Sequence, residues 1–143
     1  MKRLVLLAIL IALGSYAVVW AESDTEVQAR KTALDLAGAF TNDGLKIRDG
    51  HWSGSVKPQE PALIAVNLYA GNQYWFAAAA DKDGKKVGVK IYDEAGDQVT
   101  AENYEAGETA AAGFSPENSG QYYISVSLLE GEQGSVCLVC SYK

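Results

Sequence analysis

The chain has 143 residues, of which 48% are hydrophobic and 21% are charged, and its formal net charge is −6 at pH 7. This length and composition are typical of one globular domain with a sizeable core. The acidic balance argues against nucleic acids and anionic membrane surfaces as ligands, because phosphate binding needs clustered Lys and Arg side chains.

Residues 1–21 are expected to be a secretory signal peptide. Two basic residues precede an apolar run, and Val19 and Ala21 place small side chains at the −3 and −1 positions of a cleavage site. Cleavage after Ala21 would leave 122 of the 143 residues, with 10 basic and 18 acidic side chains and a net charge of about −8. We therefore expect a periplasmic or secreted protein. The alternative is an uncleaved membrane anchor, because apolar character continues to Trp20.

The following residues predict one helix over Asp24–Thr41, within an N-terminal segment 22–44. Ser23 and Glu26 have the spacing of a capping box, hydrophobic residues follow at helical intervals, and the Asn-Asp-Gly sequence at 42–44 is a typical C-terminal stop.

Two alanine runs, at 77–80 and 110–112, suggest where this helix packs. Alanine side chains allow a neighbouring element to approach closely. We expect the helix to lie over an outer sheet face containing Ala77 or Ala79 and to bury three of its larger side chains there. These are Val27, Leu34 and Phe40.

The remainder, residues 45–143, is predicted to be an antiparallel two-sheet β-sandwich, jelly-roll-like and with about eight strands. Short alternating runs of hydrophobic residues are separated by Gly, Pro, Asn and Asp, which is typical of strands and turns. The expected strands lie within 47–56, 63–69, 74–78, 87–91, 98–100, 109–114, 121–129 and 135–142. The turn at 93–96 is expected to close a hairpin onto 98–100.

The two cysteines, Cys137 and Cys140, lie in the last of these strands. Side chains three residues apart on a strand point to opposite faces, whereas redox pairs usually open a helix. We interpret both as small buried side chains, and a redox or metal-binding role as the alternative.

Three segments in the sandwich carry a family resemblance. They read LYAGNQYWF at 68–76, VKIYDEAG at 89–96, and FSP at 114–116 followed by SGQYYISV at 119–126. In order and spacing they resemble the signatures of bacterial pre-peptidase C-terminal (PPC) domains over residues 61–142. The resemblance implies a jelly-roll-like module of exported enzymes without catalytic residues of its own. The chain departs from that pattern in its N-terminal helix and in showing no enzyme domain, so a link to peptidases says little about its own activity.

No residues in the sequence have the spacing of a catalytic or metal site. His51 is the only histidine and stands without a partner at triad or zinc spacing, and glycine-framed nucleophile or phosphate motifs are missing. We expect no enzyme activity, no cofactor and no metal.

Two loops contain acidic residues that raise the question of calcium. They are Asp81, Asp83, Asp93, Glu94 and Asp97. We expect the loops at opposite ends of a hairpin, where the oxygens cannot converge on one ion, and calcium binding stays an alternative. The lysines that alternate with these acids, at 82, 85, 86 and 90, are interpreted as a solvated hairpin surface.

Aromatic residues are the remaining candidates for a functional surface. Several alternate out of phase with the core residues of their strands, as Trp75 and Tyr123 do beside Tyr74, Phe76 and Tyr122. The candidate ligand-binding residues are Trp52, Trp75, Tyr92 and Tyr123. The expected function is a non-catalytic exported module that binds an envelope or secreted protein or an extracellular polysaccharide. The alternative is a structural module without a ligand, with these aromatics covered by the helix.

Overall fold

The computed structural model describes residues 23–82 and 84–143, which form one helix and nine strands. The predicted signal peptide and the residue Asp83 lie outside the described residues. Helix α1 spans Asp24–Thr41, as predicted. The strands are β1 (Lys46–Ile47), β2 (Trp52–Val56), β3 (Ala62–Leu68), β4 (Tyr74–Ala80), β5 (Lys86–Tyr92), β6 (Glu102–Ala106), β7 (Thr109–Phe114), β8 (Gly120–Glu130) and β9 (Gly134–Tyr142).

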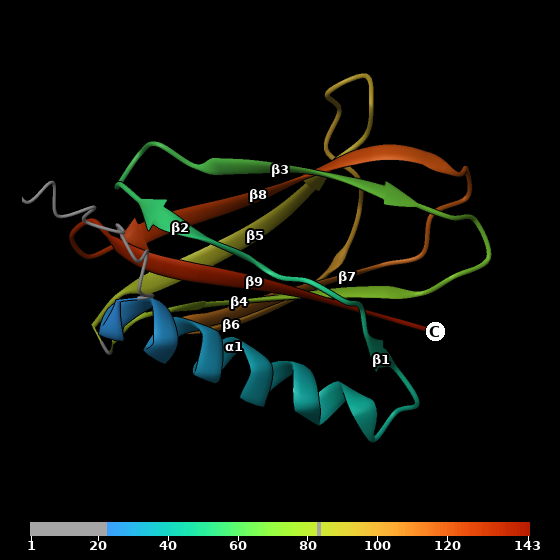
Figure 1. The fold of residues 1–143 in the computed structure, drawn as a ribbon. Helices are drawn as coiled ribbons and strands as arrows, with labels where there is room; N and C mark the ends of the chain where they lie inside the picture. Colours follow the sequence, from blue (N-terminus) through green and yellow to red (C-terminus); the bar gives the residue numbers. More distant parts are fainter. Residues whose placement is uncertain (1–22, 83) are drawn as a thin grey trace, which may run out of the picture.

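The strands form two antiparallel sheets that face one another, which confirms the predicted sandwich. The larger sheet has the order β1-β9-β4-β7-β6, with β2 also paired to β9, and the smaller has the order β3-β8-β5. Figure 1 shows α1 beneath the larger sheet and the smaller sheet on the opposite side. The molecule therefore has three layers, and the smaller sheet is an outer one.

The main core lies between the two sheets. Alternation along the strands sends one set of side chains inward, and Tyr74, Phe76, Tyr122, Ile124 and Val126 belong to this set, as predicted. Phe76, Ile124 and Val126 are fully buried. The out-of-phase neighbours Trp75 and Tyr123 are only half-buried and lie on outer faces.

Helix α1 packs on the predicted face, but through different residues. A second cluster joins its buried alanines to the outer face of β4 and β9; its members are Ala29, Ala33, Ala37, Ala77, Ala79, Cys137 and Val139. Phe40 packs against this cluster as expected, whereas Val27 and Leu34 are 41% and 39% exposed, so the prediction that they are buried is wrong. A helix that approaches a flat alanine surface closely can place only small side chains on the line of contact.

The two cysteines lie on opposite faces of β9, as the strand spacing predicted. Cys137 belongs to the cluster beneath α1, whereas Cys140 is partly buried and packs against the main core. No disulfide joins these two residues.

Two strand boundaries differ from the prediction. The expected strand at 47–56 is divided into β1 and β2 by a break in which Gly50 has a φ of 86°. The expected strand at 98–100 is replaced by the isolated bridge between Tyr92 and Gln98, and the chain instead forms β6. Every residue of β6 is exposed, so no hydrophobic alternation marks it in the sequence.

The hairpin between β4 and β5 is less solvated than predicted. Lys85 is 5% exposed, and its Nζ lies 2.5 Å from Oδ1 of Asp81, which is also buried. A Cβ on Gly134 would come within 3.0 Å of both Asp81 Oδ1 and Lys85 Cε, so glycine leaves the room for this ion pair beneath the turn between β8 and β9. Lys82 and Lys90 are exposed, as expected.

Within residues 23–82 and 84–143, no helix has the length and apolar character needed to cross a membrane.

Candidate functional site

The structure places the four candidate aromatics on three different surfaces. Trp75 lies on the outer face of the larger sheet, where its ring stacks on Phe40 of α1 with 4.8 Å between centroids and 19° between planes. The ring also covers Gly113 in the neighbouring strand β7, where a Cβ would lie 2.6 Å from Trp75 Cε2. Trp75 therefore helps to hold the helix on the sheet.

Tyr92 and Tyr123 are brought together on the outer face of the smaller sheet. They are direct cross-strand partners in β5 and β8, both half-buried, and the Tyr123 hydroxyl donates to Oε1 of Gln121 at 3.2 Å. Direct cross-strand partners place their side chains next to each other on one face of the sheet. These two residues form the aromatic part of a larger surface.

That surface continues with aliphatic side chains. Ala65 of β3 is the cross-strand partner of Tyr123, and Leu63, two residues earlier, is 64% exposed. Leu129 is 50% exposed and lies over Gly88 on the same face, further along β8 than Ser125 and Ser127, and the exposed Lys90 lies between Tyr92 and Gly88. We call Leu63, Ala65, Tyr92, Tyr123 and Leu129 the outer strip. In the described chain no helix or strand lies over it (Figure 1).

Trp52 belongs to a separate cleft between the edges of the two sheets. Its ring covers Gly54, where a Cβ would lie 2.6 Å from Trp52 Cζ2. The cleft has a volume of about 400 Å³, and we call it the edge cleft. Its lining side chains include Arg48, Asp49, His51, Trp52, Ile64, Val66, Phe76, Leu138 and Cys140.

Arg48 spans the end of the edge cleft. Its backbone N–H donates to the carbonyl of Cys140 at 2.8 Å, and its Nη1 donates to the carbonyl of Asn67 in β3 at 3.1 Å. The side chain thus connects the two sheets. No motif in the sequence marks Arg48, because only the pairing of β1 with the distant strand β9 places it here.

The edge cleft brings His51 and Cys140 to one cavity, but not as an activated pair. Burial raises the pKa of the Cys140 thiol to about 11, although the nearby Arg48 charge and its hydrogen bond lower it. The nucleophilic form of cysteine is the thiolate, which this pKa disfavours at neutral pH. The arrangement therefore gives no support to cysteine catalysis.

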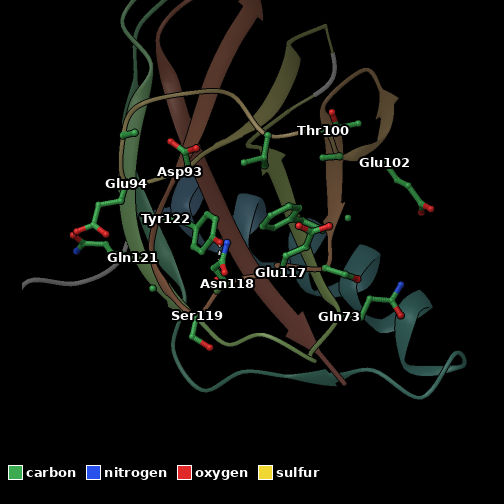
Figure 2. A pocket seen from close by; sticks show the side chains of 17 residues that line it. Gln73, Asp93, Glu94, Thr100, Glu102, Glu117, Asn118, Ser119, Gln121 and Tyr122 are labelled. Carbon is green, nitrogen blue, oxygen red and sulfur yellow. Dashed lines mark hydrogen bonds between the residues drawn. The ribbon is translucent and has the colours of Figure 1, made fainter.

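A larger and more polar cleft of about 790 Å³ lies at the opposite open side of the sandwich (Figure 2). It is bounded by the β5–β6 connection and the β7–β8 loop. Carboxylates, amides and hydroxyls line it, among them Asp93, Glu94, Thr100, Glu102, Glu117, Asn118 and Gln121. Phe114 and Tyr122 meet edge to face at 5.4 Å, and the Tyr122 hydroxyl donates to the carbonyl of Asn118 at 2.7 Å.

Two of the acidic residues considered for calcium have local partners. Asp81 pairs with Lys85, and Oδ1 of Asp93 accepts the backbone N–H of Asp97 at 2.9 Å, so the two loops lie at opposite ends of β5. In the described part of the chain, no group of three or more His, Cys, Asp or Glu side chains is arranged to hold a metal ion. The polar cleft could accept a cationic or polyhydroxylated group, since its charged side chains are all acidic.

No family model and no curated protein matches the chain.

Proposed function

We propose that the chain is an exported, non-catalytic β-sandwich that binds another protein through the outer strip. The observation that carries this proposal is the difference between the two outer sheet faces. The outer face of β4 and β9 in the larger sheet is covered by α1, whereas the smaller sheet exposes Leu63, Leu129 and Lys90 around the half-buried Tyr92–Tyr123 pair. Exposed apolar side chains that gather on one face are typical of protein-binding surfaces, and tyrosine is enriched there.

A protein partner suits this surface better than a polysaccharide. Sugar rings stack on exposed aromatic faces, but Trp75 is covered by Phe40, and Tyr92 and Tyr123 are half-buried. The most exposed side chains of the strip are instead Leu63 and Leu129. Export is supported by the predicted signal peptide, which makes an envelope or secreted protein the expected partner.

The absence of catalysis is part of the proposal and has chemical support. His51 is exposed, the Cys140 thiol has a raised pKa, and the acidic loops lie at opposite ends of β5. General acid–base and nucleophilic catalysis need such groups within hydrogen-bond reach of one another. The resemblance to PPC domains agrees with this class of module.

Affinity capture tests the proposal. The chain is immobilised and exposed to envelope and culture-medium proteins of its own cell, beside two variants. Leu63→Arg places a charge in the outer strip and should abolish capture of a specific protein. Tyr104→Arg changes a residue of β6 that is 46% exposed on the other sheet, and should leave capture unchanged. Recovery of no protein, or of a polysaccharide alone, would contradict the proposal; an equal loss in both variants would reject the outer strip as the surface.

A further inference from the structure

Strand β3 is an edge strand, and a hydrogen bond from Arg48 shows which of its backbone groups face away from the sheet. The carbonyl of Asn67 accepts from Arg48, so it points away from β8. Alternate residues of an antiparallel strand turn their N–H and C=O groups the same way. Leu63 and Ala65 therefore also direct their backbone groups outward, while Ile64 and Val66 bond to β8.

The far side of the smaller sheet gives the same assignment independently. The carbonyl of Ile91 in β5 accepts the N–H of Val99 at 2.9 Å, so Ile91 faces away from β8. Its partner in β8 is Ile124, which is also the partner of Ile64. Since the backbone of Ile124 does not bond to Ile91, it bonds to Ile64, and the outward groups of β3 again belong to the odd-numbered residues.

Each of the other three sheet edges has a feature that hinders the addition of a further strand, and β3 has none of these features. On β5, the N–H of Val87 donates to Gly107 and the carbonyl of Ile91 accepts from Val99. Strand β6 contains the exposed residues Glu102 and Glu105, and charge is a common protection of edges. Strand β2 is short, and the side chain of Gln133 bonds across to that of Ser55. Strand β3 has seven residues and no charge.

The edge cleft lies directly beside this open edge. A strand added to β3 would point the side chains opposite Ile64 and Val66 toward the inside of the sandwich, because paired residues share a face. Those side chains would enter a cleft whose lining includes Phe76, Leu138 and Trp52. The other side chains of the added strand would extend the outer strip beside Leu63 and Ala65.

Arg48 lies at the Asn67 end of the open edge and places a positive charge there, beside Asp49 in the lining of the edge cleft. Nη1 is occupied by the Asn67 carbonyl, but a guanidinium has five N–H donors. Among the described residues, no carboxylate forms an ion pair with Arg48. Pairing along β3 cannot continue past Asn67, since Arg48 already occupies its carbonyl. A chain that ends at this point would bring its terminal carboxylate to the remaining donors.

We infer that β3 accepts the C-terminal segment of a partner polypeptide as an added strand, with its terminal carboxylate on Arg48. The segment runs parallel to β3, since its end lies beside Asn67, and its alternate apolar side chains enter the edge cleft. This inference rests on the proposed function and specifies how the partner binds.

A peptide library tests the inference. Random heptapeptides displayed with free C-termini are selected on the full chain, and the enriched peptides are measured by calorimetry in free-acid and C-terminally amidated forms. We expect apolar residues at alternate positions. Amidation should weaken binding about tenfold or more, and the same loss should occur for free-acid peptides on Arg48→Gln. On Arg48→Gln, amidation should then make little further difference.

The variant Ala65→Pro tests strand addition directly. Its N–H faces outward, so proline removes a donor to the partner without removing a hydrogen bond to β8. Binding should fall about tenfold or more while the melting temperature stays nearly unchanged, and Ala65→Thr, which keeps the N–H, should bind normally. Each variant is first compared with the parent by thermal unfolding, so that loss of fold is separated from loss of binding.

The outcomes separate this inference from the proposed function. Peptides whose affinity falls with Leu63→Arg, but changes with neither amidation nor Ala65→Pro, would overturn strand addition and leave the protein-binding function standing. If no peptide is enriched but affinity capture still recovers a protein, strand addition is overturned and the proposed function stands. If no peptide is enriched and no protein is captured, both the inference and the proposed function are overturned. A dimer of the chain that dissociates with Ala65→Pro would show that β3 pairs with a second copy, which also contradicts the inference.

Discussion

Replacement of Phe40 by alanine tests how α1 is held on the larger sheet. The Phe40 ring is half-buried and stacked on Trp75, which in turn covers Gly113. The substitution removes the stack and exposes the neighbouring alanine cluster, but it changes no backbone hydrogen bond. The free energy of unfolding should therefore report the contact itself.

The expected loss follows from burial and stacking. Truncation of a fully buried Phe costs about 3–5 kcal/mol, and a stacked aromatic pair contributes about 0.5–1.5 kcal/mol beyond burial. Since Phe40 is half-buried, we expect about 2 kcal/mol. The higher helix propensity of alanine offsets about 0.5 kcal/mol. The net loss of about 1.5 kcal/mol should lower the melting temperature by roughly 5–8 °C in a domain of this size.

Thermal and urea unfolding measure this loss against a matched control. Leu34→Ala removes another large side chain from the same helix, but one that is 39% exposed, and should cost less than about 0.5 kcal/mol. In a double-mutant cycle, Phe40→Ala and Trp75→Ala should couple by about 0.5–1.5 kcal/mol. Equal losses for Phe40 and Leu34, with no coupling to Trp75, would refute this account of helix docking.

Three further predictions concern stability and thiol chemistry. A chain that starts at Leu45 should melt markedly lower, because it exposes the alanine cluster beneath α1; an unchanged melting temperature would contradict helix docking. Lys85→Ala should cost about 3–5 kcal/mol in urea unfolding by leaving Asp81 buried without its partner, whereas a loss below about 1 kcal/mol would show that Asp81 regains water. Native Cys140 should react with iodoacetamide at pH 8 about 100-fold more slowly than in urea, because burial raises its pKa from 9.0 to about 11. Because the pKa of Cys140 is higher in the folded than in the unfolded state, protonation of the thiol favours the folded state. This contribution to the free energy of unfolding is complete below pH 9 and is lost as the pH rises through about 11. Cys140→Ser should remove this pH dependence.

The sequence predicted helices and strands well where a single local pattern, such as a capping box or alternating hydrophobic residues, determines them. The start of α1 follows from its capping box, in which the Ser23 hydroxyl accepts the N–H of Glu26 at 3.3 Å, and its end follows from the Asn-Asp-Gly sequence at 42–44. The inward direction of Tyr74 and Phe76 in β4, and of Tyr122, Ile124 and Val126 in β8, follows from alternation. These signals lie within a few residues of the chain, so they can be read without the fold.

The predictions that were wrong concern residues whose burial depends on contacts with distant parts of the chain. Hydrophobic residues at helical intervals predicted that Val27 and Leu34 are buried, but the close approach of α1 to the alanine surface selects Ala29, Ala33 and Ala37 instead. Lys85 is buried because the turn between β8 and β9 covers it. No local pattern contains that information.

The candidate site was predictable only in part. The outward direction of Tyr92 and Tyr123 follows from alternation, but their pairing depends on the register between β5 and β8. The edge cleft depends on Arg48 reaching Asn67 from the opposite sheet. Strand order and register bring such residues together, and neither is specified by the residues next to them.

Amide hydrogen exchange on the complex with a captured protein tests the central claim most directly. In the unbound chain, the N–H groups of Leu63 and Ala65 should exchange quickly while those of Ile64 and Val66 are protected, because only the latter bond to β8. Binding should protect Leu63 and Ala65. Protection confined to α1 or to the polar cleft, with both edge amides still exchanging quickly, would contradict binding at the smaller sheet.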